Sequence, residues 1–169
     1  VGYERLEETA DPELAINRAL KTYLRKGYSP EWVNQRLKSI EIRKALTDEW
    51  EKRGVQEGLE YAILTDEITQ AWAEMTTKQY KNLKGLKKEN LRDNMTNMEL
   101  VLNMLAETAT TEISEKREPK TFVENKKVAK EGGTIAGNAR KQIESKTGKK
   151  IISKNNFQTI QEQKRLQKK

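Results

Sequence analysis

The chain of 169 residues contains no cysteine and no histidine. Without cysteine there can be no disulfide and no thiolate zinc site, and without histidine the histidine-dependent triads and most general-base schemes are excluded. We therefore predict a protein that is not an enzyme, with no catalytic residues, no bound metal and no cofactor. The lack of cysteine also fits a reducing compartment, and we predict a cytoplasmic location.

Aromatic residues are scarce, at 6%, and there are only three prolines. Hydrophobic residues make up 34% of the chain and charged residues 35%, which allows a modest core only. Abundant leucine, alanine, glutamate and lysine favour helix over sheet. We predict an all-α fold: a compact helical domain of about six to eight helices with a basic, partly mobile C-terminal tail. No apolar run reaches the length of a membrane span and no signal peptide is visible, so no membrane partner is expected.

The positive charge is concentrated near the C-terminus. The whole chain has a net charge of +7, whereas residues 120–169 contain 14 basic and 4 acidic side chains, a net charge of +10. Such polarisation is typical of a segment that meets phosphate or an acidic partner, and it also fits a solvated lysine-rich end.

Turn and charge signals predict three regions. Residues 1–118 are expected to form a helical core domain, residues 119–154 a basic helical extension packed on or following it, and residues 155–169 a disordered tail. Within the extension, Gly132 and Gly133 should interrupt or weaken the helix that starts after Thr121. Because residue 1 is valine, we expect the chain to be a fragment or a processed product.

One stretch, residues 84–105, carries the clearest local signals and reads KGLKKENLRDNMTNMELVLNML. Thr96 and Glu99 have the spacing of a capping box, and the apolar residues that follow predict a helix enclosed on most sides. The segment before Thr96 is basic. It therefore joins a predicted core helix to a positively charged lead-in.

Two clusters of basic residues are candidates for contact with nucleic acid or an acidic partner. The first precedes the central helix and the second lies further along the chain; together they comprise Lys84, Lys87, Lys88, Arg92, Arg140, Lys141, Lys149 and Lys150. Side chains of this kind bind phosphate and give affinity without reading the base sequence. Plain solvation of these charges is the alternative.

A second candidate surface lies on the predicted helix after Pro30. Trp32 and Trp50 are eighteen residues apart, which is five helical turns, and Arg36 and Arg43 fall near the same face. Tryptophan and arginine are enriched at protein interfaces. The alternative is structural, with the arginine stems lying along the tryptophan rings and the guanidinium groups in water.

Sequence strings that resemble catalytic motifs are incomplete. Gly132 and Gly137 have the spacing of a phosphate-binding loop, but Asn138 and Ala139 follow where lysine and a hydroxyl residue are required. A close approach of a neighbouring helix explains Gly133 and Gly137 better. The carboxylates look like helix caps and exposed positions, and no pair is placed for tuned acid–base chemistry.

Four segments carry a family resemblance. Residues 83–114 read LKGLKKENLRDNMTNMELVLNMLAETATTEIS, and RLKSIEIRKALTDEWEKRGV, EYAILTDEI and FVENKKVAKEGGTIAGNARKQIESKTGKK occupy residues 36–55, 60–68 and 122–150. Together they resemble the C-terminal region of prophage antirepressor-type proteins, which carry an N-terminal Bro domain. The KGLKK…LRDNM and NKKVAKEGG segments are also similar to the DNA-damage-inducible protein D family. The resemblance implies a prophage or mobile-element regulator with no catalytic signature.

The leading hypothesis is thus a non-enzymatic, all-α regulatory module of an antirepressor-like protein linked to the DNA-damage response. It would act by binding a protein partner, by sequence-nonspecific contact with DNA, or by both. The expected partners are DNA through its backbone, a repressor or a recombination or repair protein, and a second copy of the chain. Two alternatives remain: a helical dimerisation module without nucleic-acid contact, and a carboxylate-based, metal-dependent nuclease.

Overall fold

A computed structural model describes residues 12–169, and in this part of the chain all regular secondary structure is helical. The elements are α2 (Pro12–Lys26), α3 (Pro30–Lys52), α4 (Leu59–Ala73), α5 (Thr77–Leu83), the 3₁₀ turn η1 (Arg92–Asn94), α6 (Asn97–Arg117), α7 (Phe122–Thr147) and α8 (Phe157–Gln167). The predicted all-α class is confirmed. None of these helices is long and apolar enough to cross a membrane.

The helix starts follow the local chemistry of the sequence. Ser29 caps α3 ahead of Pro30, and Thr96 caps α6 in a capping box in which the Glu99 side chain accepts a hydrogen bond from the Thr96 N–H. A second capping box, at Thr76 and Gln79, begins α5. Each cap satisfies backbone N–H groups that the first helical turn leaves without partners. The predicted start of α6 is therefore confirmed.

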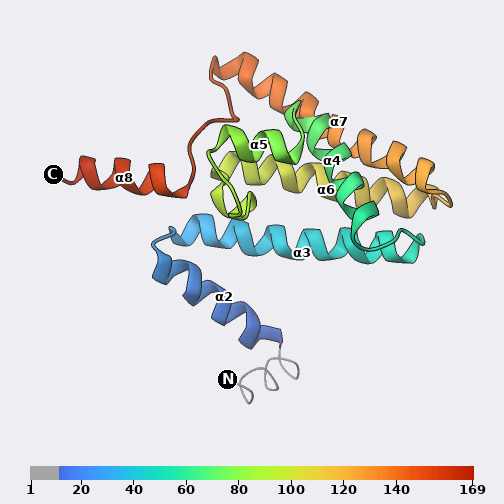
Figure 1. Cartoon of the computed structure of the whole chain (residues 1–169), viewed down its shortest axis with the longest axis horizontal. Helices are drawn as coiled ribbons and strands as arrows, with labels where there is room; N and C mark the ends of the chain where they lie inside the picture. Colours follow the sequence, from blue (N-terminus) through green and yellow to red (C-terminus); the bar gives the residue numbers. More distant parts are fainter. Residues whose placement is uncertain (1–11) are drawn as a thin grey trace.

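The core lies where α3, α4 and α7 pack around α6 (Figure 1). Trp50 of α3, Trp72 of α4 and Leu100 of α6 are buried within it. The enclosure of α6 is less complete than the sequence predicted, because Leu105 keeps 38% of its surface exposed. The helix is central, but one stripe of it faces solvent.

Helix α7 is continuous through Gly132 and Gly133, so the predicted break there is wrong. These glycines lie where α7 meets α4 and α6, and both are buried. A Cβ atom at Gly133 would lie 2.5 Å from the Ile68 carbonyl oxygen, and one at Gly137 2.5 Å from the Ala71 carbonyl oxygen. Close helix packing therefore outweighs the low helix propensity of glycine, as expected from the sequence for Gly133 and Gly137.

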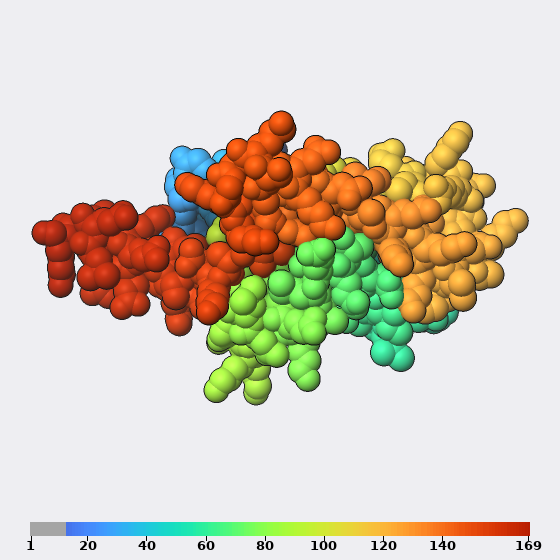
Figure 2. Space-filling view, turned by 90° about the horizontal axis from the view of Figure 1, so that it is seen from above, coloured from blue at the N-terminus to red at the C-terminus, as the bar shows by residue number. Residues whose placement is uncertain are grey.

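The predicted division at residue 118 does not separate two packing units. Helix α7 lies against both α4 and α6, and its Ala129 and Ala136 are fully buried in the same core as Trp72. Figure 2 shows α7, in orange, running across the top of the molecule. Of the two predicted arrangements, packed on the core or following it, α7 has the first and shares the core with α4 and α6.

The last residues also differ from the prediction, because residues 157–167 form α8 instead of a disordered tail. Asn156 caps α8, and the Phe157 ring stacks on Tyr28 with 3.9 Å between ring centroids. Tyr28 in turn stacks on Trp32 at the start of α3. The Phe157 ring and a hydrogen bond from Gln161 Nε2 to the Gly27 carbonyl thus anchor α8, whose sequence is otherwise too polar to indicate burial. The helix projects from one end of the molecule (Figures 1 and 2).

We expect Gly133→Ala to destabilise the domain by about 1–3 kcal/mol, because the added methyl group must displace the α4 backbone. This cost opposes the gain of about 1 kcal/mol that alanine offers over glycine within a helix. Urea unfolding measures the difference. Asn138→Ala, at an exposed position of α7, is the matched control and should be neutral or slightly stabilising. A stabilised Gly133→Ala variant would contradict the close packing.

Candidate functional site

A groove runs between α4, α5 and the loop that precedes α6. It consists of two adjoining cavities, of about 320 Å³ and about 880 Å³, which share Thr65, Thr77 and Lys81 as lining residues. The smaller cavity extends to Arg92 and Asn103, and the larger one opens past Arg43. We call the two together the basic groove, and the smaller cavity its enclosed end.

The wall of the groove is formed by two arginines that share one buried carboxylate. Glu107 of α6 is 2% exposed, and its Oε1 accepts a hydrogen bond from Arg92 Nη2 at 2.9 Å. Arg43 Nη1 lies 3.6 Å from the same oxygen, and Asn103 Nδ2 donates to it at 3.1 Å. Arg43 Nη2 also donates to Thr65 Oγ1 at 2.7 Å. Two cations on one anion leave this wall with an excess positive charge.

Burial affects the ionisation of Arg43. Removal from water lowers the pKa of its guanidinium, the Glu107 carboxylate opposes that shift, and the Arg92 charge adds to it. The guanidinium nevertheless stays charged at neutral pH, because arginine starts from a very high pKa. The wall of the groove therefore remains cationic.

Four lysines line the rest of the groove, together with the carboxylates of Glu57, Asp66 and Glu89. Lys78 and Lys81 come from α5, and Lys87 and Lys88 from the loop after it. Within the described part of the chain, none of these four amines forms an ion pair with a carboxylate. Their charges are therefore available to an anionic ligand.

The eight basic residues singled out in the sequence fall into three environments. Lys87, Lys88 and Arg92 line the groove. Lys149 and Lys150 are exposed beyond the end of α7. Lys84, Arg140 and Lys141 form ion pairs with carboxylates. The eight residues therefore do not form one surface.

Lys84 is a correction, since its side chain is fully buried and cannot contact a partner in this fold. Its amine lies 2.9 Å from Glu99 Oε1 and donates to the backbone carbonyls of Ser153 and Asn155. The Tyr80 hydroxyl donates to the other oxygen of Glu99. A buried lysine requires such partners, because an unpaired charge in the core costs several kcal/mol.

Arg140 is a second correction, because only 6% of it is exposed. Its Nε donates to the Trp72 carbonyl oxygen at 2.8 Å, and its terminal nitrogens pair with Glu74 and Glu144. Lys141, although exposed, also pairs with Glu74 at 3.2 Å. These two residues connect α7 to the end of α4, and both already have an anionic partner.

The predicted Trp/Arg interface does not form an exposed face, because Trp50 and Arg36 are buried and Trp32 and Arg43 are partly buried. Trp50 is 1% exposed, with the Arg43 guanidinium above its ring at 5.1 Å. Trp32 donates its indole N–H to the Met95 carbonyl, and Arg36 is buried on Asp93 at 2.9 Å. The predicted structural alternative does not hold for Arg43 either, because its guanidinium, and not its stem, lies over the Trp50 ring.

Asp93 links the loop before α6 to the N-terminal helices. Besides Arg36, it accepts hydrogen bonds from the hydroxyls of Tyr23 and Tyr28, through its side chain and its backbone carbonyl respectively. Burial raises the pKa of both hydroxyls, and the hydrogen bond to Asp93 adds to the shift at Tyr23. Both tyrosines therefore remain neutral donors at physiological pH.

Sequence patterns did not identify several residues of the groove and its wall. Lys78, Lys81, Thr65, Asn103 and Glu107 come from three helices, and nothing local marks them as neighbours. One signal existed: lysines recur at positions 78, 81, 84 and 87, every third residue. No group of three or more acidic side chains able to hold a metal ion occurs among the residues that the structure describes.

The fold and the groove together define the class: a small all-helical domain with a basic cleft beside its central helix. Residues 32–164 match the family model of the DinD C-terminal domain, so the chain belongs to this family. The match runs from α3 into α8 and includes every residue of the groove. It confirms the resemblance to the DNA-damage-inducible protein D family, while the resemblance to Bro-type antirepressors stays a prediction. Neither the curated proteins nor the solved structures contain a match.

The buried Tyr80 makes the free energy of unfolding decrease as the pH rises above about 10. Desolvation and the charge of Glu99 raise its pKa in the folded state far above the unfolded value of 10.0. The unfolded chain therefore loses this proton first. The neutral Tyr80 hydroxyl therefore contributes fully to the free energy of unfolding below about pH 10. Above that pH its contribution decreases by about 1.4 kcal/mol per pH unit.

We therefore expect Tyr80→Phe to lose stability less steeply than the wild type above about pH 10, by about 1.4 kcal/mol per pH unit. Urea unfolding across a pH series measures both slopes. Below about pH 9 the two curves should be parallel, with the variant less stable because it lacks the hydrogen bond to Glu99. Parallel curves up to about pH 11 would contradict the raised pKa.

Proposed function

We propose that this domain is a non-enzymatic regulatory module of a DNA-damage-inducible type of protein, and that it binds the phosphate backbone of nucleic acid in the basic groove. Its family membership supports the link to DNA damage. The observation that carries the binding proposal is the set of groove lysines without ion-pair partners, next to two arginines that share a single carboxylate.

Position and charge both favour a phosphate ligand. The two arginines are held in place by Glu107, so little side-chain freedom is lost when they meet an anion. The lysines on α5 and in the loop surround them and can follow a flexible backbone as point charges. Thr65 and Asn103 add neutral hydrogen-bonding groups. Such contacts favour backbone binding, with affinity that depends strongly on salt.

Little in the groove favours reading of the base sequence. Its walls are the sides of α4 and α5 and a loop, and no helix is presented as a recognition helix would be. Phosphate contacts position a protein on nucleic acid but do not specify sequence. We therefore propose sequence-nonspecific binding, with any partner specificity supplied elsewhere.

The test is fluorescence anisotropy with a labelled duplex and a labelled single strand of mixed sequence, across a salt series. We expect binding to weaken as salt rises, and Lys87→Ala with Lys88→Ala to reduce the slope of log K against log salt on duplex by about 1.8, or about 0.9 per lost contact. The matched control is Lys127→Ala with Lys130→Ala. These two lysines are exposed on α7 and do not line the groove, so the slope should change much less.

Absence of wild-type binding at low salt would refute the proposal. If both double variants reduced the slope of log K against log salt equally, binding would depend on the overall positive charge and not on the groove.

A second candidate function is self-association through α2. This helix lies away from the core (Figure 1) and exposes Leu14, Ile16 and Leu24 by 39–45%. Leu24 lies about 80° around the helix from each of the other two, so it can form a docking surface for a second helix with either of them. This candidate replaces the buried Trp/Arg face as the means of dimerisation.

Sedimentation velocity over a concentration series tests it. We expect the wild type to show a concentration-dependent dimer that Leu14→Ser with Leu24→Ser abolishes, because burial of these side chains drives the association. Leu59→Ser with Val123→Ser changes two aliphatic side chains that are exposed elsewhere, and this control should dimerise like the wild type. A wild-type protein that is monomeric throughout would reject the candidate.

A further inference from the structure

We propose that the enclosed end of the basic groove is a site for a phosphate monoester carried by a nucleotide, either at the 5′ end of a strand or in a free mononucleotide. This inference rests on the proposed function and deepens it, since it separates a terminal phosphate from the diester phosphates along a strand. The ligand is defined by its chemistry: a dianionic phosphate attached to a sugar.

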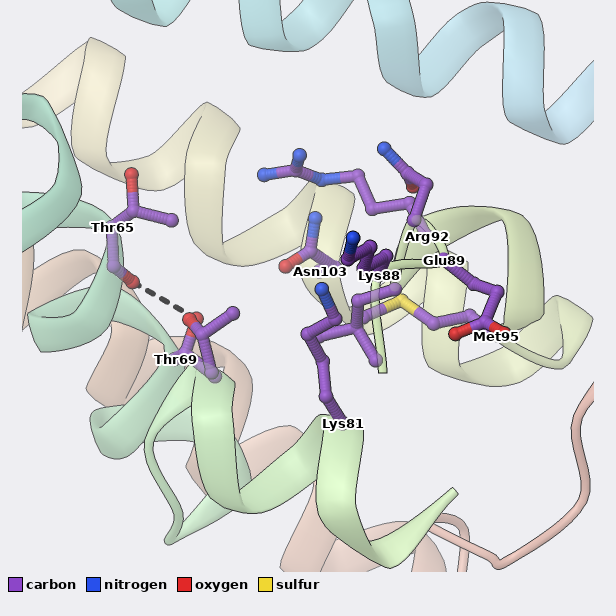
Figure 3. A pocket seen from close by; sticks show the side chains of 11 residues that line it. Thr65, Thr69, Lys81, Lys88, Glu89, Arg92, Met95 and Asn103 are labelled. Atoms are coloured by element: carbon purple, nitrogen blue, oxygen red, sulfur yellow. Dashed lines mark hydrogen bonds between the residues drawn. The ribbon is translucent and has the colours of Figure 1, made fainter. Parts of the chain in front are cut away.

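The enclosed end collects donors from three separate segments. Figure 3 shows the side chains of Lys81, Lys88, Arg92 and Asn103 gathered on one side of the cavity, with Thr65 and Thr69 on the other. Lys81 belongs to α5, Lys88 and Arg92 to the loop and η1, and Asn103 to α6. Amines, a guanidinium and an amide gathered around one space are the usual means of holding a phosphate.

The charge of this end matches a dianion. Its lining contains three cations, Lys81, Lys88 and Arg92, and one carboxylate, Glu89, which gives a net charge of +2. The Arg43 and Glu107 charges beside it cancel each other. A phosphate monoester carries a charge of about −1.5 to −2 at pH 7, whereas a backbone diester carries about −1. The monoester is therefore the better electrostatic partner.

Glu107 does not prevent binding of an anion here. Its Oε1 is occupied by Arg92, Asn103 and Arg43, and the carboxylate is 2% exposed. Arg43 Nη1 is buried without a hydrogen-bond partner and lies 3.6 Å from that oxygen. Arg92 contacts Glu107 through Nη2 alone, so its other guanidinium nitrogens can meet a ligand while that contact holds.

The size of the cavity fits a phosphate with more than the phosphate group attached. A volume of about 320 Å³ is at the lower end of the range of about 300–1,000 Å³ for small-molecule sites. Leu91 and Met95 supply apolar surface beside the charged side chains. The larger cavity continues from this end past Lys78 and Lys87 and could hold the following diesters of a strand.

The experiment compares two fluorescent single strands of identical sequence, one with a 5′-phosphate and one with a 5′-hydroxyl. We expect the phosphorylated strand to bind the wild type about tenfold more tightly or better, as for hydrogen bonds to a charged group. Lys88→Gln should lose this preference. Lys87→Gln is the matched control: the adjacent residue lines only the larger cavity, so it should weaken both strands alike and keep the preference.

The outcomes separate the two proposals. Equal affinity for both strands, or a preference that Lys88→Gln retains, overturns the terminal site and leaves backbone binding in place. If neither strand binds, backbone binding is refuted, and calorimetry with thymidine 5′-monophosphate and thymidine decides the site. Heat from the monophosphate that Lys88→Gln abolishes supports the site as a mononucleotide site, and no heat overturns it.

Discussion

The buried ion pair between Lys84 and Glu99 is the interaction on which the rest of the structure depends. It joins the end of α5 to the first turn of α6, and the same amine holds the backbone of Ser153 and Asn155. Loss of one partner of such a pair typically costs about 3–5 kcal/mol, because the other charge remains buried. The pair also closes the base of the loop over residues 85–98. That loop carries Lys87, Lys88 and Arg92, so the core fixes the position of the groove.

A second set of contacts holds the same loop from the opposite side. Asp93 accepts hydrogen bonds from Arg36, Tyr23 and Tyr28, and Phe157 donates its N–H to the Asn94 side chain. These contacts connect α2, α3 and α8 to one turn of the loop. Arg92 is therefore positioned by the packing of the whole domain, although it lies in the segment with the least regular structure. A preorganised cationic site is the consequence, since its arginines need not be ordered when a ligand binds.

Charge in this domain has two roles that look alike in the sequence. Lys84, Arg36 and Arg140 hold segments together from buried positions, whereas Lys87 and Lys88 face the groove. Lys84 and Lys87 are three residues apart in one basic run, yet one is enclosed and the other exposed. Their local sequences do not differ in any way that predicts this, because the partner of Lys84 is fifteen residues away and its carbonyl acceptors about seventy. The arrangement occurs in a domain of the DinD C-terminal domain family.

The sequence by itself determined the helical class, the cap at Thr96 and the helix that follows it, because these depend on contacts within a few residues. Only the tertiary structure decided the continuity of α7 through Gly132 and Gly133, where a neighbouring helix makes the missing side chain an advantage. It also decided which cations are buried and which line the groove. The physical reason is the same in both cases: the contacting residue is distant in the sequence and comes close only when the chain folds. Helix propensity and residue spacing therefore cannot predict the contact.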